Sequence, residues 1–414
     1  MRVLTSGTVN GVIRAPASKS MMQRAVVAAT LARGKSTILA PSLSDDGKAS
    51  LQVAQALGAH VTQGDGKVEI KGGGVPSGEP LRCGESGTSI RIFSAVSALY
   101  KVPLTLEAEG SLINRPMRMI EEPLRTLGAN VQTTDGHAPL TITGPLRGGN
   151  VTVDGSTSSQ FLSGLLMTLP GCKEDSHVLV PKLKSKPYVH MTLELLRDFG
   201  IEVQHDGALA EFSVRGGQAY TPREYTVEGD WSGASFLLVA GAISGKLTVS
   251  NLRSTSSQAD RAILEALKRA GAGVHEQRDN VTVEKRPLQS FEFDASECPD
   301  LFPPLVALAA CCKGTSTLHG VLRLAHKESD RGVALKKEFG ALGIEIELRD
   351  DVMKVTGGKI HGARVFSHHD HRIAMACGIA ALVSSGPIEI EHPECVAKSF
   401  PDFYQVIESL KQEA

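Results

Sequence analysis

Leu57-Gly58-Ala59-His60-Val61 returns four more times along this 414-residue sequence, with small changes each time. The later copies are Leu127-Gly128-Ala129-Asn130-Val131, Phe199-Gly200-Ile201-Glu202-Val203, Ala270-Gly271-Ala272-Gly273-Val274 and Leu342-Gly343-Ile344-Glu345-Ile346. Their glycines follow one another every 70 to 72 residues. A glycine after a helical segment is the usual left-handed C-terminal cap, so each copy marks a helix that runs into a strand. A fixed period of this kind predicts a repeat architecture.

Each copy closes the second half of a longer unit. A rather polar helix precedes the glycine, and a strand, a short turn and another strand follow it, as around Asp135-Gly136 in residues 131–144. The first half of each unit is an apolar helix that runs into a glycine and a strand. These six stretches are residues 24–39, 91–106, 160–180, 234–249, 301–318 and 372–390. We therefore predict βαβαββ units in which the first helix, apolar on all sides, is buried.

The sixth unit ends too early to be complete. Its second helix, at about residues 403–411, is followed by no pair of strands. Residues 1–14 have the pattern of the missing pair, with residues 8–11 as the turn. We therefore expect an α/β fold of two lobes with three repeats each. One lobe is expected over residues 17–227 and the other over residues 1–16 plus 228–414, and each is large enough for one hydrophobic core.

The composition excludes several classes of protein. The 44 Lys and Arg residues balance 45 Asp and Glu residues, so attraction to nucleic acid or to an anionic membrane is not indicated. No apolar run reaches the roughly 18 residues of a membrane span, and the N-terminus lacks a signal-peptide core. Seven cysteines without metal or disulfide spacing fit reduced thiols, so we expect a cytoplasmic protein. His368, His369 and His371 have no partner at a familiar spacing, and we predict no metal.

A charged or hydroxyl-rich cluster precedes each apolar helix. Helix N-termini carry free N–H groups and a positive dipole end, so they are natural anion sites. The clusters are Ser18-Lys19-Ser20, Glu85-Ser86-Gly87-Thr88-Ser89, Ser156-Thr157-Ser158-Ser159, Asp230-Trp231-Ser232-Gly233, Cys298-Pro299-Asp300 and His369-Asp370-His371. If the six helix starts converge, they form a cavity for a polyanionic ligand.

Cations recur at matching places in the units. A cation in the first turns of a helix, such as Lys19, opposes the helix dipole and calls for an anion beside it. Lys327 and Arg331, within the run His326-Lys327-Glu328-Ser329-Asp330-Arg331, are four residues apart, so we expect them on one helix face. The recurring cations are Lys19, Arg24, Arg115, Lys327, Arg331, Arg372 and Lys398. Charge runs are also typical of solvated helix surfaces, but the matching positions favour one shared anionic site.

At these residues the sequence resembles the 5-enolpyruvylshikimate-3-phosphate synthase family of the shikimate pathway, along the whole chain. The motifs that carry the resemblance are Asp154-Gly155-Ser156, Ser158-Ser159-Gln160-Phe161, Ser185-Lys186-Pro187-Tyr188, Lys327-Glu328-Ser329-Asp330-Arg331 and Asp370-His371-Arg372. The resemblance implies a two-lobed inside-out α/β barrel with the active site between the lobes. It also implies transfer of the enolpyruvyl group of phosphoenolpyruvate to the 5-hydroxyl of shikimate 3-phosphate, with release of phosphate and without a cofactor.

The resemblance also implies roles for individual residues. The expected ligands of shikimate 3-phosphate are Lys19, Ser20, Arg24, Ser158, Ser159, Gln160, Ser185, Tyr188, Asp300 and Lys327. The expected ligands of phosphoenolpyruvate are Lys19, Gly87, Arg115, Gln160, Arg331, Arg372 and Lys398. Addition followed by elimination needs an acid for the methylene carbon and a base for the hydroxyl proton. Our hypothesis is that Glu328 is the acid and Asp300 the base, with Lys19 stabilising charge.

The sequence departs from the family pattern at a few positions. Glu85 stands where the family has Asn, and a carboxylate facing an anion would repel it, so we expect Glu85 to be turned away, ion-paired or protonated. Ala17 replaces a common Gly, and Arg323 stands where some members have Asn in the shikimate site, so Arg323 is given no role. Glyphosate inhibits many members of the family, and Gly87 is the residue whose missing side chain would permit it here.

Other functions stay open. A UDP-N-acetylglucosamine enolpyruvyl transferase would share the fold and the donor, but it needs a reactive loop cysteine, and Cys83 lies on the wrong side of the Gly/Ser loop. A non-catalytic repeat scaffold would scatter the seven cations over its surface. An RNA phosphate-end enzyme is disfavoured by the near-zero net charge and the 4% aromatic content. We expect a monomer that acts on small anionic substrates.

Overall fold

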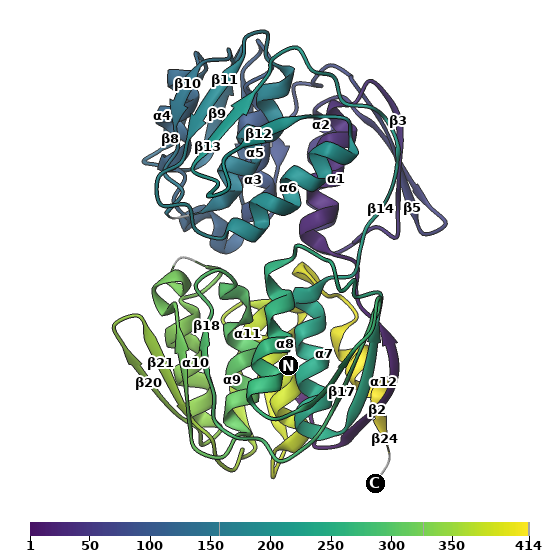
Figure 1. The fold of residues 1–414 in the computed structure, drawn as a ribbon, viewed down its shortest axis with the longest axis vertical. Coiled ribbons are helices and arrows are strands. Elements are labelled where there is room, and N and C mark those ends of the chain that lie inside the picture. The colour runs from purple at the N-terminus through teal and green to yellow at the C-terminus, as the bar shows by residue number, and fades with distance from the viewer. Residues whose placement is uncertain (157, 326, 413–414) are drawn as a thin grey trace. The chain divides into compact units, whose positions relative to one another are not determined.

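The computed structural model describes residues 1–156, 158–325 and 327–412, and it divides into two compact units (Figure 1). One unit is Lys19–Val227, and the other joins Met1–Ser18 to the chain from Glu228 onward. Thr157 and His326, which belong to two of the clusters named above, lie outside the described residues. In the part of the chain that is described, no helix is long and apolar enough to cross a membrane.

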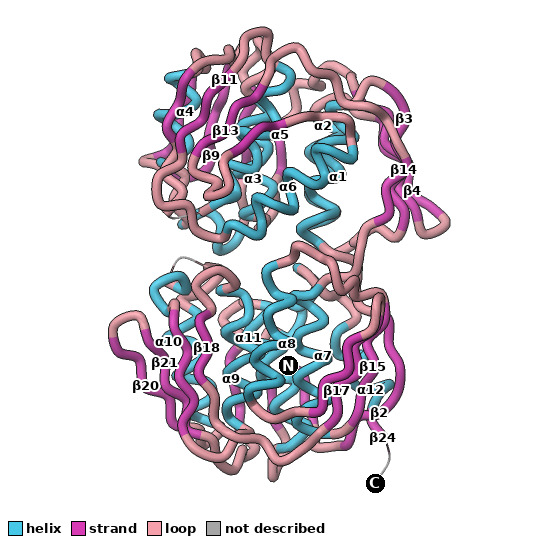
Figure 2. The backbone as a smooth tube through the Cα atoms, in the orientation of Figure 1, coloured by secondary structure: helices cyan, strands magenta, loops and turns pink. Residues whose placement is uncertain are grey.

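Three buried helices lie inside the Lys19–Val227 unit, one from each repeat, and the sheets lie outside them (Figure 2). They are α1 (Lys19–Leu31), α3 (Gly87–Ser97) and α5 (Ser159–Thr168). Helix α3 packs directly on α5, and nearly every residue of both is buried. The second helices of the repeats present more polar residues; they are α2 (Asp45–Ala56), α4 (Glu121–Thr126) and α6 (Lys186–Asp198).

The three sheets of this unit share one strand order. The strand after the first helix lies between a parallel neighbour and the antiparallel last strand of the repeat. The first sheet is β14 (Glu224–Thr226), β3 (Gly34–Leu39), β5 (Lys67–Gly72) and β4 (His60–Gly64). The second is β6 (Leu81–Arg82), β7 (Leu104–Glu107), β9 (His137–Thr143) and β8 (Asn130–Thr134). The third is β10 (Asn150–Thr152), β11 (Ser176–Leu179), β13 (Glu211–Val214) and β12 (Val203–His205).

The other unit repeats this plan. Its first helices, α7 (Trp231–Ser244), α9 (Phe302–Ala310) and α11 (His371–Ala380), pack on one another, and every residue in them is buried. Its second helices are α8 (Ile263–Arg269), α10 (Arg331–Ala341) and α12 (Phe403–Leu410). These helices confirm the predicted α/β class and the predicted burial of the first helix of each repeat.

The sheets of this unit differ in their number of strands. The regular sheet is β18 (Glu292–Asp294), β19 (Thr315–His319), β21 (Val352–Thr356) and β20 (Glu345–Arg349). A five-stranded sheet contains β16 (Gly273–Glu276), β17 (Asn280–Glu284), β15 (Lys246–Ser250), β2 (Thr8–Arg14) and β24 (Lys411–Gln412). A three-stranded sheet contains β1 (Arg2–Leu4), β23 (Ile388–Glu391) and β22 (Ala363–Phe366).

Short 3-10 helices connect these elements in both units. They are η1 (Gly110–Asn114), η2 (Arg118–Ile120), η3 (Leu169–Gly171), η4 (Ala259–Ala262), η5 (Pro299–Leu301), η6 (Val321–Leu324), η7 (Ala381–Val383) and η8 (Pro393–Lys398). Several of them carry or adjoin residues of the candidate site, because they lie at the junctions between strands and helices.

The N-terminal strands do not form the pair that the sequence suggests. Strand β1 pairs antiparallel with β23, whereas β2 pairs parallel with β15 in another sheet. The predicted turn at residues 8–11 is wrong, because these residues lie within β2. Strand β1 takes the position of the antiparallel strand that the repeat pattern requires beside β23. Strand β2 takes the position of the parallel strand that the pattern requires beside β15.

The repeated glycines have the conformation that the motif predicts. Gly58, Gly128, Gly200, Gly271 and Gly343 all have φ between 79° and 92°. This left-handed region admits glycine at little cost, so the helix ends there and the chain turns into the next strand. The turn at Asp135-Gly136 is confirmed as well, since both residues have positive φ between β8 and β9.

Candidate active site

Side-chain hydrogen bonds tie the first turns of α1, α3 and α5 together. Gln23 of α1 donates from Nε2 to Ser86 Oγ at 2.5 Å and to Ser89 Oγ at 2.9 Å. Gln160 of α5 donates from Nε2 to Thr88 Oγ1 at 2.8 Å. Three of the six predicted helix starts therefore lie close together within the Lys19–Val227 unit.

Lys19 is paired with a carboxylate that the sequence did not reveal. Its Nζ lies 2.8 Å from Asp46 Oδ2 in the first turn of α2, and the two side chains are 13% and 6% exposed. Asp46 thus supplies the anion that a cation at a helix N-terminus requires. A substrate anion that binds Lys19 has to share it with Asp46.

Arg24 is a buried cation held by neutral groups. It is 1% exposed and donates to Thr192 Oγ1 at 2.8 Å, to the Ser20 carbonyl at 2.9 Å and to the Tyr188 carbonyl at 3.3 Å. Among the residues that the structure describes, no carboxylate forms an ion pair with it. Burial lowers the pKa of Arg24 to about 10, which still leaves the guanidinium charged at neutral pH. Because its charge is uncompensated, this arginine favours an anionic ligand.

The predicted hydroxyl ligands lie at the starts of α5 and α6. Ser158 is the N-cap of α5 and accepts a hydrogen bond from the Gln160 N–H at 3.2 Å, and Ser159 follows it with 3% exposure. Ser185 is the N-cap of α6 with φ of 58°, an unusual conformation for a serine. Tyr188 lies in the first turn of α6 and is linked through its carbonyl to Arg24. Four predicted ligands of one substrate therefore belong to neighbouring helix starts.

Two arginines converge on Gly87. A methyl group at Gly87 would lie 2.7 Å from Arg115 Nη1 and 2.9 Å from Arg91 Nη1. Arg91 also donates to Gln160 Oε1 at 2.7 Å. Guanidinium groups beside the first N–H groups of a helix are well suited to bind phosphate or carboxylate. Arg91 was not among the predicted ligands, although a single charged residue inside the apolar helix α3 is a signal that could have identified it.

Glu85 is held by η1. Ser111 Oγ donates to Glu85 Oε2 at 3.4 Å, and a methyl group at Gly110 would overlap with Glu85 Oε1. The carboxylate therefore lies directly against the first turn of η1, a few residues before Arg115.

Arg331 is the centre of a second group of charged residues, in the unit that begins again at Glu228. It is 1% exposed and donates from Nη1 to Asp300 Oδ1 at 2.7 Å, from Nη2 to Glu328 Oε2 at 2.6 Å and from Nε to Asp370 Oδ2 at 2.8 Å. Charge-assisted hydrogen bonds of this length are strong. An anion can bind Arg331 only if it shares the guanidinium with these carboxylates or displaces one of them.

Asp300 is surrounded by three cations. Arg331 Nη1 lies 2.7 Å from it, Arg372 Nη2 3.1 Å and Lys327 Nζ 3.3 Å. Burial alone would raise the pKa of Asp300, but Arg372, Lys327 and Arg331 together hold it well below the ordinary value of 3.8. The carboxylate is therefore ionised throughout the physiological pH range.

The predicted common helix face of Lys327 and Arg331 is wrong. Helix α10 begins at Arg331, because the Asp330 side chain accepts a hydrogen bond from the Val333 N–H at 3.1 Å and caps the helix there. Lys327 lies in the preceding loop and nevertheless reaches Asp300. Glu328, in the same loop, lies between Arg331 and the Nζ of Lys398, which is 3.8 Å away at the end of η8.

Two carboxylates complete this group. Asp370 is the N-cap of α11 and accepts from the Arg372 N–H at 3.0 Å as well as from Arg331. Asp260 of η4 is 3% exposed, and among the described residues its Oδ1 has no hydrogen-bond partner. Burial and the charge of Asp300 raise the pKa of Asp260 to about 7, although Arg372 opposes the shift. Asp260 stands outside every motif, and only the structure places it within electrostatic reach of Asp300.

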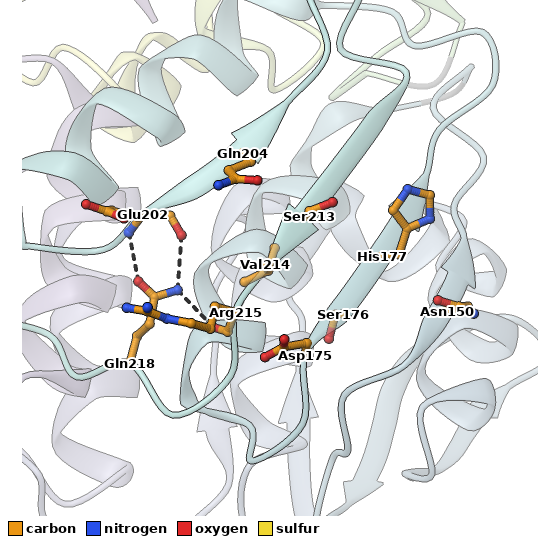
Figure 3. Close-up of a pocket in the computed structure, with 10 residues that line it drawn as sticks. All are labelled: Asn150, Asp175, Ser176, His177, Glu202, Gln204, Ser213, Val214, Arg215 and Gln218. Atoms are coloured by element: carbon orange, nitrogen blue, oxygen red, sulfur yellow. Dashed lines mark hydrogen bonds between the residues drawn. The ribbon is translucent and has the colours of Figure 1, made fainter.

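A surface hollow lies away from these residues. It measures about 460 Å³ on the sheet of β10, β11, β13 and β12 (Figure 3). Its polar groups largely bond to one another: Gln218 Nε2 donates to the Glu202 carbonyl at 3.0 Å and to the Arg215 carbonyl at 2.8 Å. None of the predicted site residues lines it, and we assign it no ligand.

Six α/β repeats, with cations near the starts of the buried helices α1, α3 and α11, define a class of α/β repeat protein suited to a small anionic ligand. The sequence matches the family described as EPSP synthase (3-phosphoshikimate 1-carboxyvinyltransferase) over residues 3–407, and the chain belongs to this family. This finding confirms the resemblance drawn from the motifs.

Individual relatives match over almost their whole length. The 3-phosphoshikimate 1-carboxyvinyltransferase of Methanocorpusculum labreanum is 38% identical, with 99% of this chain and 98% of the relative covered. The protein of the same name from Thermococcus kodakarensis is 40% identical, with 97% and 98% covered. A solved structure of EPSP synthase from Acinetobacter baumannii superimposes with a TM-score of 0.84 at 29% identity, covering 99% of this chain and 97% of that one.

Proposed function

We propose that this chain transfers the enolpyruvyl group of phosphoenolpyruvate to the 5-hydroxyl of shikimate 3-phosphate and releases phosphate. Relatives of equal length carry this activity in their names. The observation that carries the proposal at the level of chemistry is Asp300, an ionised carboxylate in direct contact with Lys327, Arg331 and Arg372. Attack of a hydroxyl group on an anionic substrate requires a base that accepts the hydroxyl proton and cations that stabilise the negative charge.

Each substrate would take ligands from both groups of residues. Shikimate 3-phosphate would bind Lys19, Ser20, Arg24, Ser158, Ser159, Gln160, Ser185, Tyr188, Asp300 and Lys327. Phosphoenolpyruvate would bind Lys19, Gly87, Arg115, Gln160, Arg331, Arg372 and Lys398. The uncompensated charge of Arg24 supports the first assignment, and the approach of Arg115 to Gly87 supports the second. We add Arg91 as a positioning residue, because it orients Gln160 at 2.7 Å.

Asp300 would accept the proton of the attacking hydroxyl group. Three cations keep it ionised but also make it a weak base, because they stabilise the carboxylate. When the carboxylate or phosphate of phosphoenolpyruvate pairs with Arg331 and Arg372, the hold of these cations on Asp300 weakens and its pKa rises. Binding of the donor would thereby make Asp300 a stronger base at the time when it is needed.

Glu328 would act as the acid in the addition and as the base in the elimination. In the addition it gives a proton to the methylene carbon of phosphoenolpyruvate while the substrate oxygen bonds to the adjacent carbon. In the elimination it takes a proton back from the resulting methyl group, and the carbon–oxygen bond to phosphate breaks. Its Oε2 accepts a hydrogen bond from Arg331 at 2.6 Å, so Glu328 shares Arg331 with a bound substrate anion or releases it.

A UDP-N-acetylglucosamine enolpyruvyl transferase is less compatible with the site. Cys83, the nearest candidate for the reactive thiol, is fully buried and its Sγ donates to the Leu81 carbonyl at 3.6 Å. Burial raises the pKa of this thiol, which disfavours the reactive thiolate. Seven free thiols support a reducing compartment, so we propose a cytoplasmic location.

Release of inorganic phosphate tests this function. We expect release only when phosphoenolpyruvate and shikimate 3-phosphate are both present, and neither compound alone should yield phosphate. Glu328→Gln should lose about 10²–10⁴-fold in rate, the usual contribution of a proton-transfer group. Glu345→Gln, the same change on an exposed part of β20, is the control and should keep the wild-type rate. Phosphate release without the acceptor would contradict the proposal.

A further inference from the structure

Glu338 is a buried carboxylate outside both groups of proposed ligands. It lies on α10, two turns after Arg331, and its side chain is 4% exposed. Its Oε2 accepts a hydrogen bond from the Phe366 N–H at 2.9 Å, and its Oε1 lies 2.7 Å from His368 Nε2. A buried carboxylate is costly unless its oxygens are bonded. These bonds lead to the last residue of β22 and to the loop that follows it.

This loop, residues 367–370, connects β22 to α11 and has a strained backbone. His368 and His369 have φ of 55° and 53°, and a left-handed conformation persists in such residues only where their surroundings impose it. The Phe366 ring lies 4.8 Å from the ring of His368, and the His369 ring lies 4.5 Å from that of His392. The loop is therefore held in place from several sides.

Helix α10 holds both ends of the loop. Glu338 binds Phe366, the last residue of β22, and His368 within the loop, and Arg331 binds Asp370, with 2.8 Å between Nε and Oδ2. Asp370 caps α11, so the loop also decides where Arg372 lies, and Arg372 Nη2 is 3.1 Å from Asp300. A displacement at Phe366 or His368 would be passed on to the guanidinium of Arg372.

We propose that Glu338 is a positioning residue of the transfer reaction, which fixes the loop so that Arg372 is held ready for phosphoenolpyruvate. The identity of that ligand rests on the proposed function. The other charged group on α10 near the carboxylate is Lys337, whose Nζ lies 3.6 Å from Oε1 and whose side chain is largely exposed. The principal partners of Glu338 are thus Phe366 and His368.

Steady-state kinetics of Glu338→Gln tests the role. The KM for phosphoenolpyruvate should rise at least about tenfold, while the KM for shikimate 3-phosphate stays within about twofold, because Arg372 is assigned to phosphoenolpyruvate alone. A merely structural role would reduce the amount of active enzyme, and so kcat, without this difference between the substrates. Glu345→Gln, on exposed β20, is the matched control. Equal KM values for phosphoenolpyruvate in the two variants would overturn the proposal.

His368 gives a second test that keeps Glu338 in place. His368→Gln retains a donor toward the carboxylate and should preserve the KM for phosphoenolpyruvate, whereas His368→Leu removes the donor and should raise it. If Leu and Gln at this position have the same effect, the contact with Glu338 does not position the loop.

Hydrogen exchange separates this proposal from the proposed function. Amides of residues 366–372 should exchange at least about tenfold faster in Glu338→Gln than in Glu345→Gln. Faster exchange in a protein that lacks transferase activity would refute the proposed transferase function but would support the role of Glu338 in fixing the loop. Unchanged exchange of these amides would refute the role of Glu338 in fixing the loop, whether or not the protein has transferase activity.

Discussion

Asp300 illustrates how a single side chain can be tuned by the cations around it. Its contacts with Arg331, Arg372 and Lys327 keep its pKa well below 3.8. Replacement by Asn would remove the base without changing the shape of the side chain. We expect Asp300→Asn to lower kcat by about 10²–10⁴-fold, measured as phosphate release. Asp279→Asn, at an exposed position, should be close to wild type, and an equal loss in both variants would exclude Asp300 as the base.

The same tuning predicts the pH dependence of the wild type. Asp300 has a depressed pKa, so it remains ionised as the pH falls toward 4. An acid-side loss of kcat/KM above about pH 5 would therefore have to come from another group, because kcat/KM reports the free enzyme and substrates. If Asp300→Asn keeps some activity but no longer loses kcat/KM on the acid side, the loss in the wild type belongs to Asp300, and its pKa is not depressed.

Gly87 leaves room for two guanidinium groups. A methyl group would come within 3.0 Å of Arg115 and Arg91, whose flexible ends can move away at little cost in stability. Gly87→Ala should therefore keep the wild-type melting temperature but raise the KM for phosphoenolpyruvate about tenfold, equivalent to about 1.4 kcal/mol of binding. Inhibition by glyphosate should weaken in parallel. Tight binding of glyphosate by the variant would contradict the contact at Gly87.

Asp260 should make the protein less stable as the pH rises. Its folded pKa of about 7 lies above the ordinary 3.8, so its contribution to stability is fully present below pH 4 and is lost as the pH rises through 7. Asp260→Asn carries no charge at any pH. Its free energy of unfolding relative to wild type should thus increase between pH 4 and 7, by up to about 4 kcal/mol. Urea unfolding at pH 4.5 and 7.5 measures this, and a constant difference would argue against a raised pKa.

At the scale of elements, the N-terminal strand β2 joins distant parts of one unit. It pairs parallel with β15, and Val9 on its inner face is fully buried, whereas Val12 is 72% exposed. Val9→Ala should lower the free energy of unfolding by about 2 kcal/mol through lost burial and a small cavity. Val12→Ala, the same change on the same strand, should have almost no effect. Equal effects in urea unfolding would mean that β2 is not packed as described.

The sequence predicts those elements whose signals are local. A glycine after a helix, such as Gly58, and a polar cap before an apolar helix, such as Ser86, each define a boundary within a few residues. The pairing partner of a short strand cannot be predicted in this way. The sequence of Arg2–Leu4 does not indicate that its partner is β23, whose edge is free. Pairing of this kind depends on which sheets remain incomplete after the rest of the unit has folded.

The same distinction applies to the site. Lys19, Arg331 and Arg372 stand at helix starts, so their type and position together indicated an anion site. Asp46 and Asp260 are far from these motifs in sequence and reach the site only through tertiary packing. Arg91 is an intermediate case, because an isolated charge within an apolar helix suggests a function without naming its partner.

At the scale of the whole molecule, the proposed transfer requires that phosphoenolpyruvate loses its phosphate by cleavage of the carbon–oxygen bond. A phosphatase or a phosphoryl transferase would instead break the phosphorus–oxygen bond. The most direct measurement uses phosphoenolpyruvate labelled with ¹⁸O at the bridging oxygen, together with shikimate 3-phosphate, and mass spectrometry of the products. The label should appear in inorganic phosphate in equal amount to the enolpyruvyl product. Label retained in pyruvate, or phosphate without a coupled product, would contradict the proposed transfer.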